Sequence, residues 1–323
     1  MASFTLGVDE LRARGGGKWH RYDPDVLPAF VADMDFLVAP PVQEALSRFT
    51  KRQDYGYGLQ TDPGRLHAAF SAWMARRHGW RADPELTIAT GDVVQAIVAT
   101  LVAFTDPGEG VIAQTPVYPP FLTSIANTRR RLIENPLSES PERFEVDRAG
   151  LAQAASEARL LLLCNPHNPT GRVFERAELE AIAAIARERD LTIVSDEIHA
   201  DLIYEGARHI PIETLAPERT VTLTSATKGF NIPAVRTAVL HFGTPELKER
   251  FEARIPEHLL GVPSRFGIEA TIAAWTEGEA WLAEVLAYLD ANRRRVGEWA
   301  ASTPLGHHRP EATYLAWFDC MRN

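Results

Sequence analysis

Apolar and polar positions along the chain follow two patterns that alternate. Short, continuous apolar runs predict buried strands, and longer segments in which apolar residues recur at helical spacing predict helices. Because the two alternate through most of the chain, the sequence predicts an α/β fold in which a mostly parallel sheet is covered by helices on both faces. Strands are expected at Gly110–Ala113, Arg159–Cys164, Thr192–Ser195, Thr220–Thr224 and Thr237–Phe242, and helices at Pro41–Thr50, Gly64–His78, Val93–Phe104, Arg176–Arg189 and, as one long stretch, Ile268–Trp299.

Composition narrows the class of protein without deciding it. The 323 residues exceed the usual size of one domain and 45% of them are apolar, so two domains and a sizeable core are expected. The formal net charge of −9 argues against a nucleic-acid or an anionic-membrane partner. Neither Cys164 nor Cys320 has neighbours at the spacing of a zinc site, so no metal site is predicted. No signal peptide or long apolar span is evident, and we expect the protein to work in the cytoplasm.

Three polar side chains, Asn168, Asp196 and Lys228, each stand just past a different predicted strand. Ligands of an open parallel sheet collect outside the carboxyl ends of its strands, so we expect these side chains in one site. They match what pyridoxal phosphate requires: a lysine for the Schiff base, a carboxylate that keeps the pyridine nitrogen protonated, and a neutral donor for the ring 3-oxygen. Asp196 could instead be a helix N-cap and Asn168 a turn residue, but the order and spacing of all three favour the cofactor.

Two residues near the predicted lysine are candidates for binding a phosphate. Arg236 follows Lys228 by eight residues and offers a charged fork, and Ser225 precedes it by three residues and offers a hydroxyl donor. Arg236 could alternatively pair with a carboxylate at the surface.

Segments from nearly the whole chain carry a resemblance to a known family. They are Val31–Phe36, Tyr55–Gly58, Thr115–Phe121, Asn165–Gly171, Ser195–Tyr204 and Ser225–Pro233. Together they resemble the fold-type I pyridoxal-phosphate enzymes of the aminotransferase superfamily and, more narrowly, its MalY/PatB cystathionine β-lyase subfamily. The resemblance implies an aspartate-aminotransferase-like fold. Its large, cofactor-binding domain would span residues 46–265, residues 1–45 would contribute to a small α+β domain, and residues 266–323 would form a linker helix and the rest of that small domain.

The resemblance implies a role for each residue of the central motifs. Lys228 would hold the cofactor covalently, and Asp196 would pair with its pyridine nitrogen. Asn168 would bind the ring 3-oxygen, and Tyr118 would stack on the ring face. His199 matches a second contact near the 3-oxygen, with a structural, hydrogen-bonded histidine as the alternative.

The phosphate is expected at the turn that opens the helix Val93–Phe104. The backbone amides of Val93 and Val94 would be unpaired there, and the helix dipole favours an anion at that end. Asp92 stands where the resemblance implies glycine. Because a carboxylate beside a phosphate is unfavourable, we expect Asp92 to point away and cap the helix.

The resemblance also implies an assembly. Tyr57 matches a tyrosine that reaches the cofactor phosphate of the neighbouring subunit, which implies a homodimer with shared active sites. An ordinary half-buried aromatic residue is the alternative. Asp33 and Phe36 are expected to line the substrate side of the site.

The reaction that the resemblance implies is a β-elimination on a small sulfur amino acid. The freed Lys228 would remove the substrate's α-proton as a general base. A sulfur leaving group would then depart from the β-carbon of cystathionine or a related cysteine S-conjugate, giving pyruvate, ammonia and a thiol. Transamination by the same site and a non-catalytic, cofactor-binding regulatory role are the two alternatives.

The end of the chain departs from the resemblance. Tyr314–Asp319 resembles the first strand of the family's C-terminal domain, whereas relatives continue for several dozen residues and supply an arginine for the substrate α-carboxylate. We therefore expect an incomplete small domain, and a chain that binds cofactor better than it turns over substrate.

Overall fold

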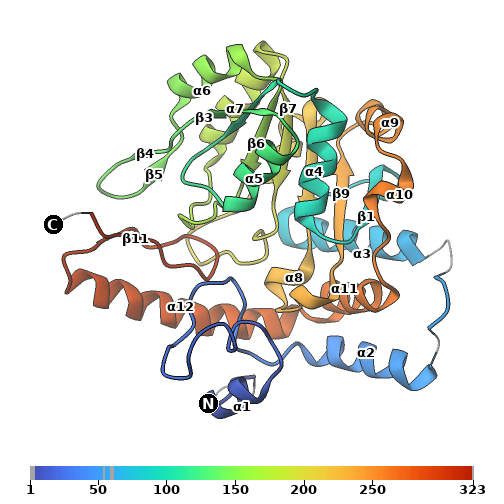
Figure 1. The fold of residues 1–323 in the computed structure, drawn as a ribbon, viewed down its shortest axis with the longest axis vertical. Helices are drawn as coiled ribbons and strands as arrows, with labels where there is room; N and C mark the ends of the chain where they lie inside the picture. Colours follow the sequence, from blue (N-terminus) through green and yellow to red (C-terminus); the bar gives the residue numbers. More distant parts are fainter. Residues whose placement is uncertain (1–3, 54, 59–61, 322–323) are drawn as a thin grey trace.

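A mixed sheet forms the centre of the molecule (Figure 1). The computed structural model describes residues 4–53, 55–58 and 62–321, and seven strands of this part of the chain make up the sheet. Their order across it is β1 (Thr87–Thr90), β9 (Ala238–Phe242), β8 (Thr220–Thr224), β7 (Thr192–Asp196), β6 (Leu160–Cys164), β2 (Gly110–Ala113) and β3 (Arg131–Glu134). β9 is antiparallel to its neighbours β1 and β8, and the other pairs are parallel.

Most of the remaining structure is helical. The helices are α1 (Val8–Ala13), α2 (Pro40–Arg52), α3 (Asp62–His78), α4 (Val93–Phe104), α5 (Pro119–Asn127), α6 (Arg148–Ala154), α7 (Arg176–Glu188), α8 (Ala226–Gly229), α9 (Pro245–Arg254), α10 (Glu257–Leu260), α11 (Arg265–Glu277) and α12 (Glu279–Ala301). Two further strand pairs lie outside the central sheet: β4 (Ser138–Glu139) with β5 (Phe144–Glu145), and β10 (Gly306–His307) with β11 (Phe318–Asp319). Over the described ranges, no helix is both long and apolar enough to span a membrane.

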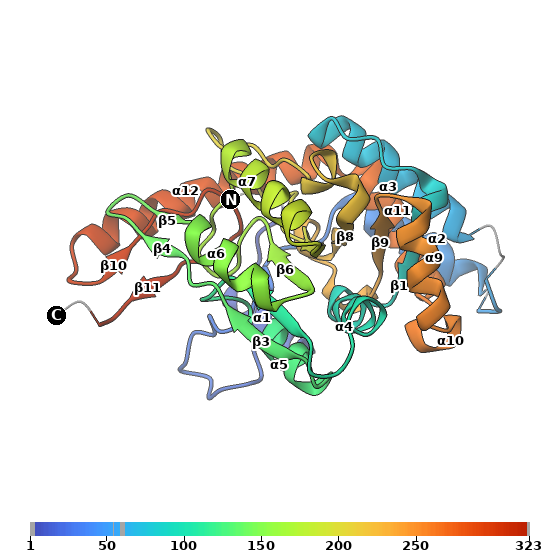
Figure 2. The same ribbon diagram turned by 90° about the horizontal axis from the view of Figure 1, so that it is seen from above.

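Helices cover both faces of the sheet because its central strands are apolar on both sides. β6, β7 and β8 are buried at every position, as is usual for parallel strands between two helical layers. One core cluster joins the sheet to α4, α5 and α9, and a second joins it to α6 and α7 (Figure 2). The predicted α/β fold with a mostly parallel sheet is confirmed.

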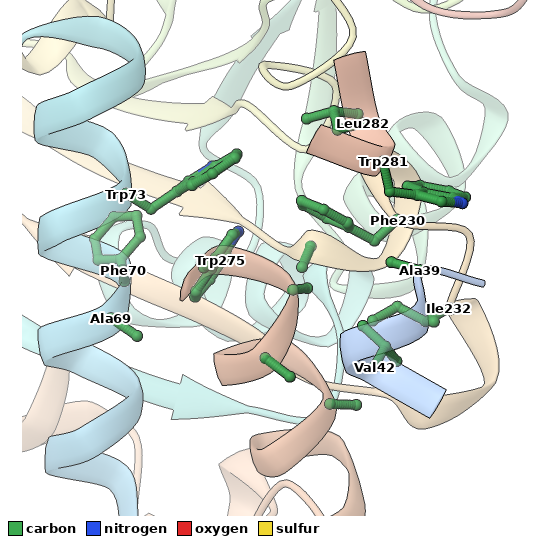
Figure 3. Close-up of a cluster of buried hydrophobic side chains, with 14 of the residues drawn as sticks. Ala39, Val42, Ala69, Phe70, Trp73, Phe230, Ile232, Trp275, Trp281 and Leu282 are labelled. Carbon is green, nitrogen blue, oxygen red and sulfur yellow. The ribbon is translucent and has the colours of Figure 1, made fainter. Parts of the chain in front are cut away.

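A third core cluster supports the turn that carries Lys228. Trp73 of α3 and Trp281 of α12 both contact Phe230, with ring-centroid distances of 5.7 and 6.1 Å (Figure 3). Phe230 follows Lys228 by two residues. The packing of α3 and α12 therefore fixes the backbone from which this lysine projects.

The single long helix predicted over Ile268–Trp299 is wrong, because the chain forms two helices that meet at Gly278. The Gly278 amide closes α11 by donating to the carbonyl of Ala274. A Cβ at residue 278 would lie only 2.5 Å from Cε1 of Phe230. Glycine is thus required for the close packing on Phe230, and α11 ends and α12 begins where that packing occurs.

The strand predicted over Tyr314–Asp319 is much shorter in the structure. Only its last two residues pair, as β11 with β10. Upstream, the Thr313 amide donates to the carbonyl of Leu202 over 2.8 Å, and Ala312 forms an isolated bridge with Ile203. These contacts hold the backbone against the loop after β7 and leave it unavailable for a longer strand.

Candidate active site

A cavity of about 960 Å³ lies where β6, β7 and β8 end. Cys164 is the last residue of β6, Asp196 is the last residue of β7, and Ser225 follows β8; all three line the cavity. Most of the residues that the sequence predicts for a cofactor site are brought together around it. They are Val93, Val94, Tyr118, Asn168, Asp196, His199, Ser225, Lys228 and Arg236.

Asp196 is a buried carboxylate at the base of the cavity. One of its oxygens, Oδ1, accepts a hydrogen bond from the amide of Ile198 at 3.0 Å. No helix begins after it in this part of the structure, so Asp196 closes a turn and does not cap a helix. Burial raises its pKa to about 7, with the charge of Glu197 adding to that effect and Lys228 opposing it. A cation bound against this carboxylate would stabilise its ionised form.

Lys228 projects from the short helix α8 into the same cavity. Burial lowers the pKa of its amine, and the carboxylates of Asp33 and Asp196 act in the opposite direction. Its Nζ donates a hydrogen bond of 2.6 Å to the carbonyl of Ala32. A lysine with a lowered pKa has more neutral amine, which is the form that reacts with an aldehyde or takes a proton.

Asn168 and Tyr118 are joined through the backbone. The Tyr118 amide donates to the Asn168 carbonyl at 3.0 Å, and the Asn168 amide donates to Sγ of Cys164. Tyr118 stands at the N-cap of α5 and is partly exposed to the cavity. Burial raises the pKa of its phenol, and the charges of Asp196 and Asp92 raise it further. The phenol is therefore neutral. These contacts hold an amide and an aromatic ring beside the carboxylate.

His199 is buried and lines the cavity. Burial lowers its pKa to about 3, with Lys228 contributing, so the ring is neutral. Its Nδ1 has no hydrogen-bond partner within the described residues. The predicted alternative, a histidine satisfied by structural hydrogen bonds, therefore does not account for this nitrogen.

The N-terminus of α4 forms another part of the cavity wall, with Val93 and Val94 at its first two positions. Asp92 caps this helix as predicted, because its Oδ1 accepts a hydrogen bond from the Gln95 amide at 2.7 Å. The prediction that Asp92 points away from the site is wrong. Its second oxygen, Oδ2, pairs with the guanidinium of Arg236, and both side chains line the cavity. The alternative predicted for Arg236, an ion pair with a carboxylate, is what the structure contains.

Ser225 is the N-cap of α8, and its side-chain oxygen accepts from the Thr227 amide at 3.1 Å. The hydroxyl also lies 2.5 Å from the carbonyl of Thr237, to which it donates. Ser225 therefore lies on the cavity wall but already has hydrogen-bond partners in the protein.

Three predicted residues lie outside the cavity wall. Phe36 is only 8% exposed and packs edge-on against Phe4 and Tyr288, at 5.1 and 5.4 Å, so it belongs to the core and not to a substrate surface. Asp33 is half-buried, and its charge raises the pKa of Lys228. Tyr57 is fully exposed, and the half-buried alternative considered for it is wrong.

Several residues of the cavity were missed by sequence reasoning. Cys164, Ile198 and Thr227 flank predicted residues, and their positions at strand ends could have identified them. Tyr314, which lies behind the cavity wall and contacts two of its residues, had no such signal. Its hydroxyl donates to the Ala32 carbonyl, a contact between residues 282 positions apart, and its ring meets His199 edge-on at 6.3 Å.

The side chains around the cavity fit pyridoxal phosphate. A buried carboxylate, Asp196, suits a protonated ring nitrogen, and the neutral ring of His199 on the cavity wall suits a polar atom of the ring. Lys228 suits the aldehyde, and the N-terminus of α4 suits a phosphate. The donor set therefore includes one group for each polar part of that cofactor.

Comparison with known proteins agrees with this geometry. The family model described as "Aminotransferase class I and II" matches residues 31–323, and the chain belongs to that family. Within it, the chain is similar to Bacillus subtilis (strain 168) "Cystathionine beta-lyase PatB", at 34% identity over 91% of this chain and 78% of the relative. It is also similar to Escherichia coli (strain K12) "Protein MalY", at 31% identity over 91% of this chain and 77% of the relative.

A solved structure supports the same placement. Cystalysin from Treponema denticola, crystallised with a pyridoxal 5'-phosphate cofactor, superposes with a TM-score of 0.90 at 31% identity, over 99% of this chain and 84% of the other. The aspartate-aminotransferase-like fold and the resemblance to the MalY/PatB group are thereby confirmed.

Proposed function

We propose that this chain is a pyridoxal-phosphate-dependent carbon–sulfur β-lyase that cleaves cystathionine or a related cysteine S-conjugate to pyruvate, ammonia and a thiol. The observation that carries the proposal is the shared cavity of the Lys228 amine and the Asp196 carboxylate. The name of PatB supports elimination over transamination for this group of proteins.

When bound, pyridoxal phosphate supplies an electron-accepting ring that stabilises negative charge at the α-carbon of an amino acid. Lys228 would hold the cofactor covalently, and its free amine would be the base that takes the proton from that carbon. The lowered pKa of Lys228 suits this role because only the neutral amine can accept a proton. Asp196 would hold the ring nitrogen protonated. The resulting pyridinium cation would lower the pKa of Asp196, opposite to the effect of burial.

The other residues orient the cofactor. Asn168 and His199 would bind the ring 3-oxygen, and Tyr118 would stack on the ring. The phosphate would be bound by the amides of Val93 and Val94 at the N-terminus of α4. The side chains of Ser225 and Arg236 would also bind it.

We further propose a homodimer in which Tyr57 reaches the phosphate of the partner's site. Tyr57 is fully exposed in one chain, which supports a role outside its own cavity. Phe30, Val31 and Leu259 line the cavity and are themselves exposed. An exposed apolar rim of this kind supports a second copy lying over the mouth of the site.

Steady-state assays of the purified, cofactor-loaded chain with cystathionine test the proposal. The expected products are pyruvate, ammonia and homocysteine in equal amounts, without a keto-acid acceptor. Formation of a keto acid only when an acceptor is added would identify an aminotransferase. Cofactor binding without either product would identify the non-catalytic alternative.

Lys228→Ala and Lys248→Ala provide matched controls for this assay. Lys248 lies on α9 and donates to the carbonyl of Glu85, and it does not line the cavity. Product formation should be lost in the first variant and retained in the second. Equal loss in both would point to a general effect of removing a lysine.

A further inference from the structure

The carbonyl of Ala32 accepts two hydrogen bonds from distant parts of the chain. Lys228 Nζ donates to it at 2.6 Å, and the Tyr314 hydroxyl donates to it at 3.1 Å. A carbonyl oxygen has two lone pairs, so these two donors use its full capacity. The lysine at the centre of the proposed reaction is therefore linked through one backbone atom to a tyrosine that the sequence did not indicate.

The segment that contains Ala32 is clamped onto the lysine turn. The Asn231 side chain accepts from the Met34 amide at 3.1 Å and donates to the carbonyls of Met34 and Phe36 at 2.9 and 3.0 Å. Asn231 follows Lys228 by three residues and has a φ of 56°, in the left-handed region. Because one turn holds both Lys228 and the clamp, the Ala32 carbonyl and the lysine keep a fixed relative position.

Tyr314 is fixed from the opposite side. Thr313, the residue before it, has a φ of 69°, and a threonine adopts this left-handed conformation only when its surroundings hold it there. The Tyr204 hydroxyl donates to the Thr313 carbonyl at 2.6 Å, and the Thr313 amide donates to Leu202. Both partners lie on the loop that follows Asp196, so the phenol of Tyr314 is attached to the same framework as the proposed site.

We propose that Tyr314 is a positioning residue that acts on Lys228 through the shared Ala32 carbonyl. By donating to that carbonyl, the phenol weakens the hydrogen bond available to a protonated Lys228 amine, and so keeps a larger fraction of the amine neutral at a given pH. The bond also fixes the direction of the carbonyl, and hence of the amine that donates to it. This inference rests on the proposed function only for the role of Lys228 as a base.

The sign of the effect follows from the charges that face Lys228. Burial disfavours its protonated form, whereas Asp33, from the segment that contains Ala32, and Asp196, from β7, favour that form. Neutral His199 and neutral Tyr314 add no charge, since burial lowers the pKa of the first and raises that of the second. A hydrogen bond from an ionised donor is stronger than one from a neutral donor. Removing the Tyr314 bond to the Ala32 carbonyl would therefore stabilise mainly the protonated form of Lys228 and raise its pKa.

The test measures Lys228 directly, in the cofactor-free chain. Competitive acylation with acetic anhydride across a pH series, read by mass spectrometry of the Lys228 peptide, gives the apparent pKa of this amine. Tyr314→Phe should move the Lys228 titration to higher pH and lower its acylation rate at pH 8 by about threefold, equivalent to about 0.6 kcal/mol. Because no cofactor or substrate is present, the result is independent of whether the protein is a lyase.

Tyr55→Phe is the matched control. The Tyr55 hydroxyl also donates to a backbone carbonyl, that of Thr50, but this bond lies away from Ala32 and from the contacts that hold Thr313 and Tyr314. Its titration of Lys228 should match that of the wild type. Equal shifts in both variants, or no shift in Tyr314→Phe, would overturn the proposal.

A second change keeps the test decisive if the phenylalanine variant does not fold. Replacement of Tyr314 by 3,5-difluorotyrosine retains the hydroxyl and makes it a stronger donor. The Lys228 titration should then move to lower pH, opposite to the phenylalanine variant. A shift to higher pH, or none, would contradict the shared-carbonyl mechanism.

Discussion

Arg236 forms an ion pair with Asp92, the residue that caps the N-terminus of α4. The guanidinium is 68% exposed, and the carboxylate also accepts a hydrogen bond from the amide of Gln95. Arg236 and the amides of α4 are among the groups proposed to bind the cofactor phosphate. The Asp92 carboxylate thus lies beside the proposed phosphate site and shares its arginine.

Asp92→Asn should therefore tighten the binding of pyridoxal phosphate. Asparagine is as good an N-cap as aspartate, so α4 should remain capped, while a negative charge near the phosphate is removed. Because Arg236 is exposed and screened by solvent, we expect a modest decrease in Kd, roughly threefold to tenfold. Absorbance titration of the cofactor-free chain measures this Kd.

Pyridoxal, which lacks the phosphate, is the matched ligand for that experiment. Its Kd should be the same in the wild type and in Asp92→Asn. Weaker binding of pyridoxal phosphate to the variant would mean that Asp92 holds Arg236 in a productive orientation. An equal change for both ligands would place the effect away from the phosphate.

Lys228 should carry the cofactor covalently. The wild-type protein loaded with pyridoxal phosphate should be yellow, and reduction with borohydride should bleach it and leave the cofactor mass on the Lys228 peptide. Lys228 lines the cavity, and its lowered pKa favours reaction with an aldehyde. Lys228→Ala should yield no labelled peptide, whereas Lys248→Ala should be labelled like the wild type. Label on any other lysine would refute the assignment.

Local patterns of the sequence predicted the cavity wall because its residues follow strands directly. Asn168, Asp196 and Lys228 each come just after a run of buried apolar residues, and the ends of neighbouring parallel strands meet at one edge of a sheet. No tertiary information was needed for these positions beyond the strands themselves.

The segment near residue 33 shows where such reasoning failed. Asp33 and Phe36 were both expected on the substrate side, yet burial alternates along the residues that join them. Met34 and Phe36 are buried, whereas Asp33 and Asp35 are half-buried. This alternation was visible in the sequence and would have assigned Phe36 to the core.

Two other features depend on contacts that no local pattern reports. Gly278 divides the predicted long helix because Phe230 packs against it, and the two residues are far apart in the sequence. Tyr314 was expected in a strand, but its neighbours are held by the loop after β7. In both places a tertiary contact overrides the periodicity of the segment.

The buried carboxylate of Asp196 should make the cofactor-free chain less stable as the pH rises. Its folded pKa of about 7 lies above the unfolded value, so the folded state binds more protons between about pH 4 and pH 7. The free energy of unfolding therefore falls through this window. Asp196→Asn cannot ionise, so its stability relative to the wild type should rise from pH 4 to pH 7 and level off above pH 8.

Urea unfolding of both proteins at a series of pH values measures this difference. Because the pKa of Asp196 is raised from 3.8 to about 7, the gain in free energy of unfolding of Asp196→Asn over the wild type should be at most about 4 kcal/mol. Asp190→Asn serves as the control, because Asp190 is exposed and the hydrogen bond from Arg219 lowers its pKa. Its stability relative to the wild type should not rise over the same range. A flat difference for Asp196→Asn would show that the carboxylate is ionised in the folded, cofactor-free chain.

The last prediction concerns the proposed homodimer with shared sites. If Tyr57 binds the phosphate in the partner's site, each site takes Lys228 from one chain and Tyr57 from the other. Lys228→Ala and Tyr57→Phe then remove residues that different chains supply. Each variant alone should have little lyase activity, but a mixed dimer contains one site with both residues intact. Mixing the two after mild dissociation should recover up to about half of the activity per mixed dimer, measured as pyruvate release.

Tyr55→Phe is the matched control, because Tyr55 is also exposed and donates a long hydrogen bond to the carbonyl of Thr50. It should be active by itself. Mixed dimers shown by mass spectrometry to form, but without activity above either parent, would exclude a site shared through Tyr57.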